Sequence, residues 1–555
     1  MKAQLQICLL CATLALAAAP AAAQPAIGAI INNYSATLPG LPNYGIAQGS
    51  IFQLWGTGMA GSVSAQNAPL QTTVAGTTIN VTVAGVTTHP PLYYLSPTQI
   101  NGILPSSTPV GTGTITVTYN NQTSPSFPIQ VVQSAFGMLS LNQAGTGPSA
   151  VLDVNYHLLG FANAANPNDY LNFWGTGLGP ISGDETVYPQ TQTNLTNIPI
   201  EVDIGGVKAT VTYHGRSQFP GLDQVQVQVP SGVSGCYVSV VVVSGSGNVV
   251  SNFGTIPVVT SGRTCSDQTS VLSASQLQTL SNQSTVSYGA LLVGQTTTTT
   301  QPITVSGIII QPGGTTVADS ASALFVRYTG LEFQDAVQTI PSPGSCAVFT
   351  MSESSGVANP FLPTYLNAGA AVNVTSPQGK QALTPVTTGI YSNSALPTGF
   401  VPASGGAFSF DNGSGGSDVG PFTASLTAAA PLTWTNMNSI TTVTRSQGVT
   451  VNWTGGAASS FVQIFGSAFS GSSSSAVGGY FYCTAPVSAG TFTVPASVLL
   501  SLPPTGSYSY GATTIPIPGS LSVSNYSNPK QFTATGLDFG YVTFFSTNTV
   551  EPAYQ

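Results

Sequence analysis

The sequence predicts an all-β protein built from tandem immunoglobulin-like β-sandwich domains. Charged residues make up only 4% of the 555 residues, which excludes coiled coils and solvated helical bundles because both depend on charge. Apolar and polar residues alternate along many short segments, the pattern of strands with one buried face. Gly, Pro, Asn and Ser clusters separate these segments and helical periodicity is nearly absent, which favours sandwiches over parallel sheets.

The first 23 residues are typical of a secretory signal peptide. Lys2 precedes an apolar run over 9–18, and small residues follow at 21–23, so we expect cleavage after Ala23. The apolar run is shorter than a bilayer requires, which argues against a retained membrane helix. Cys11 lacks the small preceding residue of a lipoprotein signal. No other segment is long and apolar enough to span a membrane, so we expect a secreted or cell-surface protein.

Strands are predicted wherever alternation is strict, and the clearest cases are 79–83, 114–119, 200–204, 225–229, 449–453 and 491–494. Each has an apolar residue at every second position, so one face is expected to be buried. A short helix or a linker is expected over 271–280. The Thr run at 295–301 and the Ser-rich segment at 470–475 are expected to be solvated loops or linkers.

An internal repeat organises the first half of the chain. The segment Ile-Phe-Gln-Leu-Trp-Gly-Thr-Gly at 51–58 returns as Tyr-Leu-Asn-Phe-Trp-Gly-Thr-Gly at 170–177, and later landmarks follow in the same order. Two copies of one sandwich explain this repeat. Trp55 and Trp174 have apolar neighbours and are predicted to lie in the two cores, with a sugar-stacking platform as the alternative.

Four β domains are therefore expected after the signal peptide. The two repeat copies supply the first pair, and the second half divides near 428–431, where a strand gives way to Ala-Ala-Ala-Pro. The third domain is expected to begin with a linker. The predicted organisation is a signal peptide over 1–23 and domains over 24–134, 135–262, 263–430 and 431–555.

Four cysteines remain after cleavage, and in an exported chain they indicate two disulfides. Three pairings are possible from sequence alone. We favour Cys236 with Cys265, which would tie the chain back to the second domain, and Cys346 with Cys483, which would join the third and fourth domains. A metal site is not expected, because the chain has no C-x-x-C and no His near these cysteines.

Two stretches of the first half carry a resemblance. Tyr-Leu-Ser-Pro-Thr-Gln-Ile-Asn at 94–101 and the series of motifs at 162–167, 173–180, 202–209 and 221–230 together resemble the secreted Solibacter-type C-terminal domain of acidobacterial proteins. The resemblance covers about residues 25–260. It implies an IPT/TIG-like immunoglobulin fold and an exported, non-catalytic module of unknown ligand, and it brings no site residues. Asp-Gln-Val-Gln at 223–226 and Cys236 depart from the family pattern.

Catalytic motifs are missing: the chain has no G-x-S-x-G, no H-E-x-x-H and no P-loop. His89, His157 and His214 are expected in exposed loops or turns, although a triad is spatial and spacing does not decide it. Paired carboxylates, which a glycosidase requires, are expected to be ordinary surface residues. The pairs are Asp184 with Glu185, Glu201 with Asp203, Glu332 with Asp335, and Asp411 with Asp418.

The loop from Asp411 to Asp418 has the composition closest to a cation site. Asp411, Asn412 and Asp418 offer oxygen ligands, and glycines between them permit tight turning. The loop matches neither EF-hand spacing nor a repeated Gly-rich calcium motif. An ordinary hairpin loop is therefore expected, with calcium as the alternative and no other cofactor.

The predicted function is that of an exported bacterial adhesion-type module, non-catalytic, with a binding or structural role at the cell surface. Eight scattered basic residues provide no patch for nucleic acid, so an extracellular protein, a polysaccharide or a second copy is the expected partner. One alternative is a carbohydrate-binding or carbohydrate-active protein with a cleft in the C-terminal half, lined by Tyr480, Tyr482 or Trp434 and two carboxylates. Another is a subunit of a surface layer or fibre.

Overall fold

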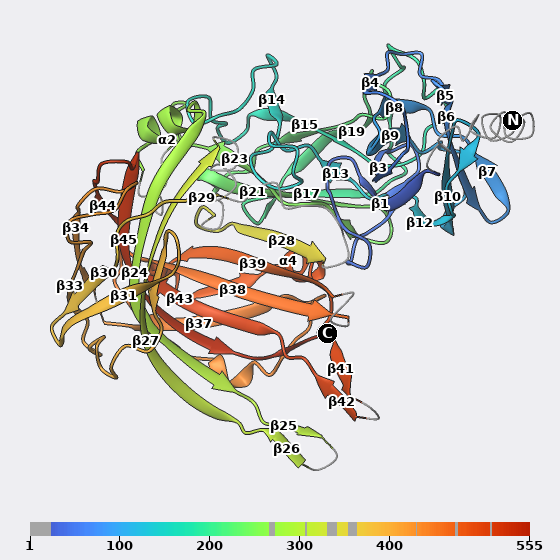
Figure 1. The fold of residues 1–555 in the computed structure, drawn as a ribbon. Coiled ribbons are helices and arrows are strands. Elements are labelled where there is room, and N and C mark those ends of the chain that lie inside the picture. The colour runs from blue at the N-terminus through green and yellow to red at the C-terminus, as the bar shows by residue number, and fades with distance from the viewer. Residues whose placement is uncertain are drawn as a thin grey trace, which may run out of the picture.

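The computed structural model confirms the all-β prediction (Figure 1). It describes residues 24–265, 272–305, 308–329, 341–352, 363–428, 430–471, 476–510 and 513–555. The predicted signal peptide, residues 1–23, lies outside them. Within the described ranges, no helix has both the length and the apolar composition needed to cross a membrane.

Two sheets that face each other form the first sandwich. One has the order β1-β3-β9-β8-β4, with bounds Ala26–Asn32, Ile51–Thr57, Gln99–Ile103, Leu92–Leu95 and Ser64–Ala65. The other has the order β2-β12-β10-β6-β5, with β11 on β10 and β7 on β6. Its bounds are Ile46–Ala47, Phe127–Val132, Gly111–Tyr119, Thr77–Val83, Thr73–Val74, Gln122–Thr123 and Val86–Thr88. Alternate residues such as Ile79, Val81 and Val83 fill the core between the sheets.

The second sandwich follows from β13 onward. One sheet has the order β13-β15-β20-β19-β16 with β14 on β15, over Gly137–Met138, Tyr170–Thr176, Asp223–Gln228, Thr210–Arg216, Thr193–Asn194 and Val151–Asp153. The other has the order β18-β17-β21-β22 with β23 on β21, over Val207–Lys208, Ile200–Ile204, Gly235–Ser244, Val249–Val250 and Gly254–Val258. The repeat segments at 51–58 and 170–177 lie at equivalent places, on β3 and β15.

The two repeated tryptophans do not lie in the cores, and that prediction is wrong. Trp55 and Trp174 are only partly buried, whereas the residues before them, Leu54 and Phe173, belong to the two cores. Successive side chains of a strand point to opposite faces, so each Trp lies on the outer face of its sheet. Trp55 shares that face with Gln53, whose Oε1 accepts a hydrogen bond from the indole Nε1 at 3.2 Å.

One long sheet forms the frame of the second half, with strands in the order β28-β39-β38-β43-β45-β24-β27-β32-β31-β30-β33-β34 and with β29 on β27 and β44 on β45. The bounds are Cys346–Ser352, Val477–Pro486, Phe461–Ser470, Ser520–Tyr526, Phe539–Val550, Thr285–Thr300, Gly314–Thr329, Ile390–Asn393, Gly379–Thr387, Val372–Ser376, Gly406–Asp411, Thr423–Ala428, Thr364–Tyr365 and Lys530–Phe532. In Figure 1, β24 and β27 run as a long curved pair through this body, with β30, β33 and β34 on one side and β38 and β39 on the other.

Two separate cores pack against this sheet. One holds mainly residues between 432 and 523, including Trp434 and Trp453, and the other holds mainly residues between 291 and 428. Strand β45 contributes side chains to both cores, because Val550 packs in the first core and Phe544 packs in the second. The change of core falls close to the boundary expected near 430, but the sheet runs on across that boundary.

The Thr run, expected as a solvated loop, is the second half of β24, and this correction has a clear cause. Thr296 to Thr299 pair with β27 on one side and with β45 on the other. Threonine is β-branched, which favours extended backbone. The segment expected as a helix or linker does include a helix, α2 (Ala274–Ser281), which Ser273 and Gln276 begin with a reciprocal capping box.

Smaller elements complete the body. They are β35 (Leu432–Trp434), β37 (Val449–Gly455) and β40 (Thr491–Val494) in a three-stranded sheet, and the pairs β36 (Thr442–Val443) with β46 (Ala553–Tyr554), β25 (Ile303–Val305) with β26 (Ile308–Gln311), and β41 (Ser507–Tyr510) with β42 (Thr513–Pro516). Helix α4 (Ala496–Leu500) and the 3₁₀ turns η2 (Met437–Ser439) and η3 (Val487–Ala489) lie between them. The hairpins β25–β26 and β41–β42 project together from one end of the body (Figure 1).

Candidate functional site

The first two sandwiches meet in a seam of buried and partly buried polar contacts. Glu185 of the second sandwich accepts hydrogen bonds from the backbone N and the hydroxyl of Ser106 of the first, at 2.9 and 2.5 Å. Thr176 Oγ1 accepts a bond from the backbone N of Ile51 at 2.8 Å. Burial raises the pKa of Glu185 above 4.5, although the Ser106 bonds and Arg216 act in the opposite direction.

An ion pair without solvent exposure lies behind this seam. Arg216 Nε donates to Asp223 Oδ1 at 2.7 Å, and both side chains are 0% exposed. The other oxygen of Asp223 accepts from the backbone N of Gly177 and Leu178. Gly49 of the first sandwich (φ 73°) fits against the pair, because a Cβ there would lie 2.8 Å from Arg216 Nη2.

A second seam joins the sandwiches to the long-sheet body. Strand β21 bonds with the chain that enters β28: the Tyr237 and Ser239 backbone N atoms donate to the hydroxyls of Ser342 and Ser345 at 2.9 and 3.0 Å. Asn43 of the first sandwich contacts both neighbours, because its Nδ2 donates to Leu500 O and its Oδ1 accepts from Val250 N.

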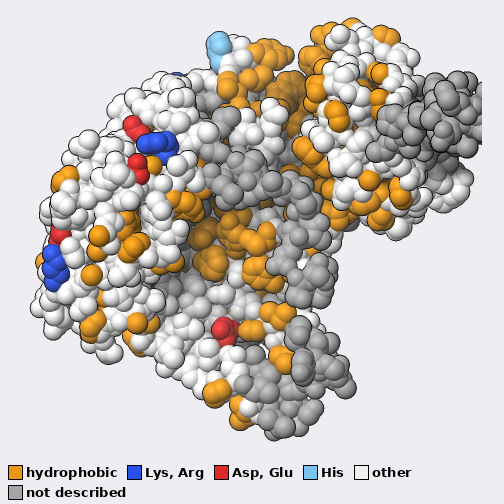
Figure 2. Space-filling view, viewed as in Figure 1, with side chains coloured by type: hydrophobic (Ala, Val, Ile, Leu, Met, Phe, Trp, Pro, Cys, Tyr) orange, Lys and Arg blue, Asp and Glu red, His pale blue; other side chains and the backbone are white. Residues whose placement is uncertain are grey.

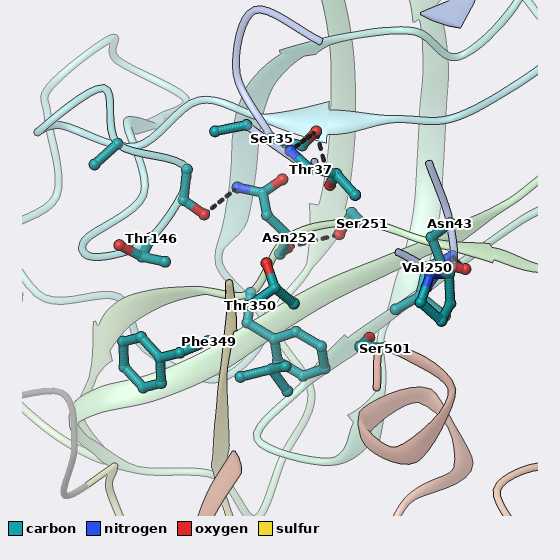
Figure 3. Close-up of a pocket in the computed structure, with 16 residues that line it drawn as sticks. Ser35, Thr37, Asn43, Thr146, Val250, Ser251, Asn252, Phe349, Thr350 and Ser501 are labelled. Atoms are coloured by element: carbon teal, nitrogen blue, oxygen red, sulfur yellow. Dashed lines mark hydrogen bonds between the residues drawn. The ribbon is translucent and has the colours of Figure 1, made fainter. Parts of the chain in front are cut away.

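A pocket of about 120 Å³ lies where the three parts meet (Figure 3). The first sandwich contributes Ser35, Thr37 and Asn43, the second contributes Thr146 and the segment 250–253, and the body contributes 348–350 and Ser501. Asn252 is held in place, since its Nδ2 donates to Met138 O and Gly145 O at 2.9 and 3.0 Å. Hydroxyl and amide groups share the wall with apolar side chains such as Phe253 and Val348, and no charged residue is among those that line it. We call this hollow the junction pocket.

An aromatic patch adjoins the junction pocket on the long sheet. It consists of Phe349 on β28, Tyr480 and Tyr482 on β39, and Phe465 on β38, all partly exposed. The Phe349 and Tyr480 rings stack with centroids 5.2 Å apart, and Phe465 lies 5.2 Å from Tyr482. Figure 2 shows a hollow on this side of the molecule with hydrophobic side chains on its floor, where β38 and β39 run in Figure 1.

The predicted cleft aromatics divide between the patch and a core. Tyr480 and Tyr482 lie in the patch, and burial raises the pKa of Tyr482. Trp434 is 5% exposed and packs in a core, so it lines no cleft. Phe349 and Phe465 were missed by the sequence reasoning. The signal was present, because each alternates with core residues along its strand and so faces away from the core.

Both predicted disulfides are present: Cys236 bonds to Cys265, and Cys346 bonds to Cys483. The second bond crosses from β28 to β39 at directly paired positions. It therefore fixes the strand that carries Phe349 to the strand that carries Tyr480.

The candidate calcium loop is held by its own hydrogen bonds. Asp411 accepts from Lys380 Nζ and Asn373 Nδ2, both at 2.8–2.9 Å, and these bonds lower its pKa against the effect of burial. Asn412 is 5% exposed. Its side-chain Nδ2 donates to the backbone oxygen of Ala368, and its Oδ1 accepts from the backbone N of Phe422. Asp418 Oδ2 accepts from the backbone N of Asn367 at 2.8 Å. Calcium binding at this loop stays a hypothesis.

The other titratable candidates have local partners. His89 contacts Asn80, His214 contacts two backbone carbonyls, and His157 pairs with Asp153. Across the ranges that the structure describes, no three His, Cys, Asp or Glu side chains group as metal ligands. Glu332 and Asp335 lie outside those ranges.

One predicted acid pair does line a hollow. Glu201 and Asp203 face a hollow of about 500 Å³ between the second sandwich and helix α4. Glu201 is paired with Lys208. Burial, and then the charge of Glu201, raise the pKa of Asp203, which makes this pair the natural place to test for catalysis.

Comparisons with known proteins give weak likenesses only. No family model matches the chain, and no curated protein matches it. A tetra-tandem repeat from the extending region of a large adhesion protein aligns over 95% of this chain and 99% of its own, with 12% identity and a TM-score of 0.13. A Ca²⁺-stabilised adhesin that helps an Antarctic bacterium bind ice aligns over 95% and 99%, with 10% identity and a TM-score of 0.12. Domains 5–6 of the S-layer protein SbsC align over 42% and 98%, with 15% identity and a TM-score of 0.16. At these TM-scores the likenesses carry no argument about function.

Proposed function

We propose that the chain is an exported, non-catalytic adhesion-type module that presents a binding surface from a rigid frame. The observation that carries this proposal is the pair of seams. Contacts such as Glu185 with Ser106 and Asn43 with Leu500 join the three parts directly. A fixed frame of this kind orients a surface at low entropic cost.

The chemistry of the surface supports the same role. Only 24 of 555 residues carry a formal charge, counting 8 basic and 16 acidic residues, so polar contacts depend mainly on hydroxyl and amide groups. Such a surface attracts ligands by shape and hydrogen bonding and provides little electrostatic steering. The two disulfides fit an oxidising, extracellular compartment.

The test is retention on cell envelopes. The chain from residue 24 onward would be labelled and sedimented with isolated bacterial envelopes, and the bound fraction measured against protein concentration. We expect saturable retention that stays constant over hours and releases no soluble fragments from the envelope. Absence of saturable retention would overturn the proposal.

The same experiment tests the catalytic alternative. If envelope material is released with time, Asp203→Asn and Glu201→Gln would be compared with the parent chain. Release that disappears with either substitution would identify an enzyme and would contradict the non-catalytic proposal. Asp184→Asn is a matched control, because Asp184 is an exposed acid bonded locally to Thr186.

A further inference from the structure

Hydroxyl side chains continue the aromatic patch across the long sheet. Phe465 pairs with Ser522 on β43, and Ser522 pairs with Thr549 on β45. Directly paired residues point to the same face of a sheet, so these hydroxyls lie beside the aromatic patch. The next row holds Ser524 and Thr547, and within each row the two hydroxyls are 2.8 Å apart. Ser522 and Ser524 are buried and support Thr549 and Thr547, which are partly exposed and present the accessible hydroxyls. We call these four residues the hydroxyl rows.

The junction pocket lies at the edge of the same sheet. Phe349 links the two features, because it is among the pocket-lining residues and its ring stacks on Tyr480. Side chains alternate along β28, so the Phe349 ring faces the patch, whereas Thr350 points to the opposite face of the strand (Figure 3). The pocket therefore adjoins the patch around the edge strand β28, and the hydroxyl rows continue the patch across the sheet.

The strands of this surface carry no charged side chain, and Figure 2 shows a single acidic side chain elsewhere in the visible part of the hollow. The strands β28, β39, β38, β43, β45 and β24 contain no Asp, Glu, Lys or Arg. Phosphate, sulfate and carboxylate ligands are recognised through Arg or Lys, and cationic ligands through carboxylates. The absence of both kinds of side chain from these strands favours a neutral ligand.

A neutral polysaccharide has the chemistry that complements this surface. A sugar ring has an apolar C–H face, which packs on an aromatic ring, and a rim of hydroxyls, which exchange hydrogen bonds with Ser, Thr and amide groups. The pocket of about 120 Å³ admits the edge of a sugar ring but not a folded segment of protein. An extended chain lying along the strand rows would contact rings and hydroxyls in turn.

We propose that the aromatic patch, the hydroxyl rows and the junction pocket bind a neutral polysaccharide. The proposal rests on the binding role proposed above and names its ligand class. Phe349 and Tyr480 stack on sugar rings, and the disulfide between Cys346 and Cys483 keeps their two strands in register.

Calorimetric titration with soluble neutral polysaccharides tests the proposal, with laminarin, mannan and arabinoxylan as probes and alginate as the anionic comparison. We expect at least one neutral probe to bind and alginate not to bind. Raising NaCl from about 50 to 500 mM should leave the affinity unchanged, because no ion pair is involved. Tyr480→Ala and Phe349→Ala should each weaken binding by about tenfold or more, whereas Tyr480→Phe should retain it.

The control is Tyr156→Ala, which removes an aromatic side chain that is 70% exposed in the second sandwich. It should bind as the parent does. Thermal unfolding of each variant separates loss of binding from loss of fold, and Tyr480→Phe keeps the test informative if Tyr480→Ala fails to fold.

Two outcomes overturn this inference without touching the proposed function. One is retention on envelopes that survives periodate oxidation of glycans but is lost after protease treatment of the envelopes. The other is glycan binding that persists at full strength in both alanine variants. Failure of envelope retention itself would instead count against the proposed function.

Discussion

Burial of a few charged side chains fixes the seam between the first two sandwiches. Arg216 and Asp223 share one hydrogen bond, and backbone groups bond to Arg216 Nη2 and to the second oxygen of Asp223, while Arg216 Nη1 has no hydrogen-bond partner in the described structure. Burial raises the pKa of Glu185, and this effect is larger than the opposite effect of the positive charge on Arg216. A buried pair of this kind contributes little net stability but is costly to break. Both residues belong to the second sandwich, and the pair shapes the surface on which Gly49 of the first sandwich packs.

Glu185 should make stability depend on pH. Its pKa is raised on folding, so the folded state holds the proton more tightly than the unfolded state. The protonated Glu185 carboxyl therefore contributes to the free energy of unfolding. This contribution is fully present below the ordinary pKa of about 4.5 and is lost as the pH rises through the raised pKa. We therefore expect the melting temperature of the parent, relative to Glu185→Gln, to fall as the pH rises from about 4 to 7.

Asp184→Asn provides the opposite-sign control for this pH series. Hydrogen bonds from Thr186 lower the pKa of Asp184. The contribution of the ionised Asp184 carboxylate to stability is therefore present above its ordinary pKa and is lost as the pH falls through the lowered pKa. Differential scanning calorimetry at several pH values measures both variants. A parent-minus-variant difference for Glu185→Gln that is flat or that rises with pH would contradict the expectation.

Strand pairing over long sequence distances builds the second half of the chain. Strand β24 lies between β27, its antiparallel hairpin partner, and β45, a parallel neighbour about 250 residues later in the sequence. Parallel pairing of this kind needs a long connection, and here the connection contains most of both cores. Among the described strands, β28 pairs in this sheet with β39 alone, and the disulfide from Cys346 to Cys483 reinforces that attachment.

Removal of this disulfide should loosen β28. Cys346→Ser with Cys483→Ser opens a loop with a sequence separation of 137, and loss of a native disulfide typically costs about 2–4 kcal/mol. We expect faster amide hydrogen exchange over 346–352, because edge strands open first, and weaker binding at the aromatic patch. Exchange over β10 should stay unchanged. Unaltered exchange in β28 would show that pairing with β39 suffices by itself.

The arrangement of the three parts depends on neutral hydrogen bonds as well as on apolar packing. Val241, Val250 and Phe253 of the second sandwich pack in a core of the long-sheet body, so the two units share buried surface. The Asn43 side chain forms hydrogen bonds with both neighbours, to Val250 N of the second sandwich and to Leu500 O of helix α4. The parts therefore behave as one body in this structure.

Small-angle X-ray scattering should detect this rigidity. We expect a radius of gyration that does not change between about 50 and 500 mM NaCl, because screening acts on charges and not on neutral contacts. Asn43→Ala removes both of its bonds and should increase the radius of gyration. Asn155→Ala, in an exposed turn, is the matched control. A parent chain whose dimensions require a broad ensemble would contradict a fixed frame.

Local patterns were enough for much of the architecture. Alternation at 79–83 and 449–453 predicted β6 and β37 correctly, because side-chain direction in a strand has a period of two and is visible in the sequence. The cysteine pairs were also predicted, since an exported chain with four cysteines favours two bonds. Tyr480 and Tyr482, the cleft aromatics of the alternative carbohydrate hypothesis, are partly exposed, and a ligand contact for them stays a prediction.

Other features required the tertiary structure. The sequence predicted Trp55 in the core, but the core of the first sandwich takes Phe52 and Leu54 instead. Both alternating sets of side chains on this strand include apolar residues, so the sequence did not show which set the opposite sheet would cover. The Thr run lies inside the sheet because β45, from the end of the chain, pairs with it on the side opposite β27. The neutral surface of Phe349, Tyr480 and the hydroxyl rows exists only after β28, β39, β43 and β45 pair. The sequence by itself determined which segments form strands, since that depends on neighbours along the chain. Strand pairing and the meeting of the three parts were decided by contacts between residues hundreds of positions apart, which no local pattern records.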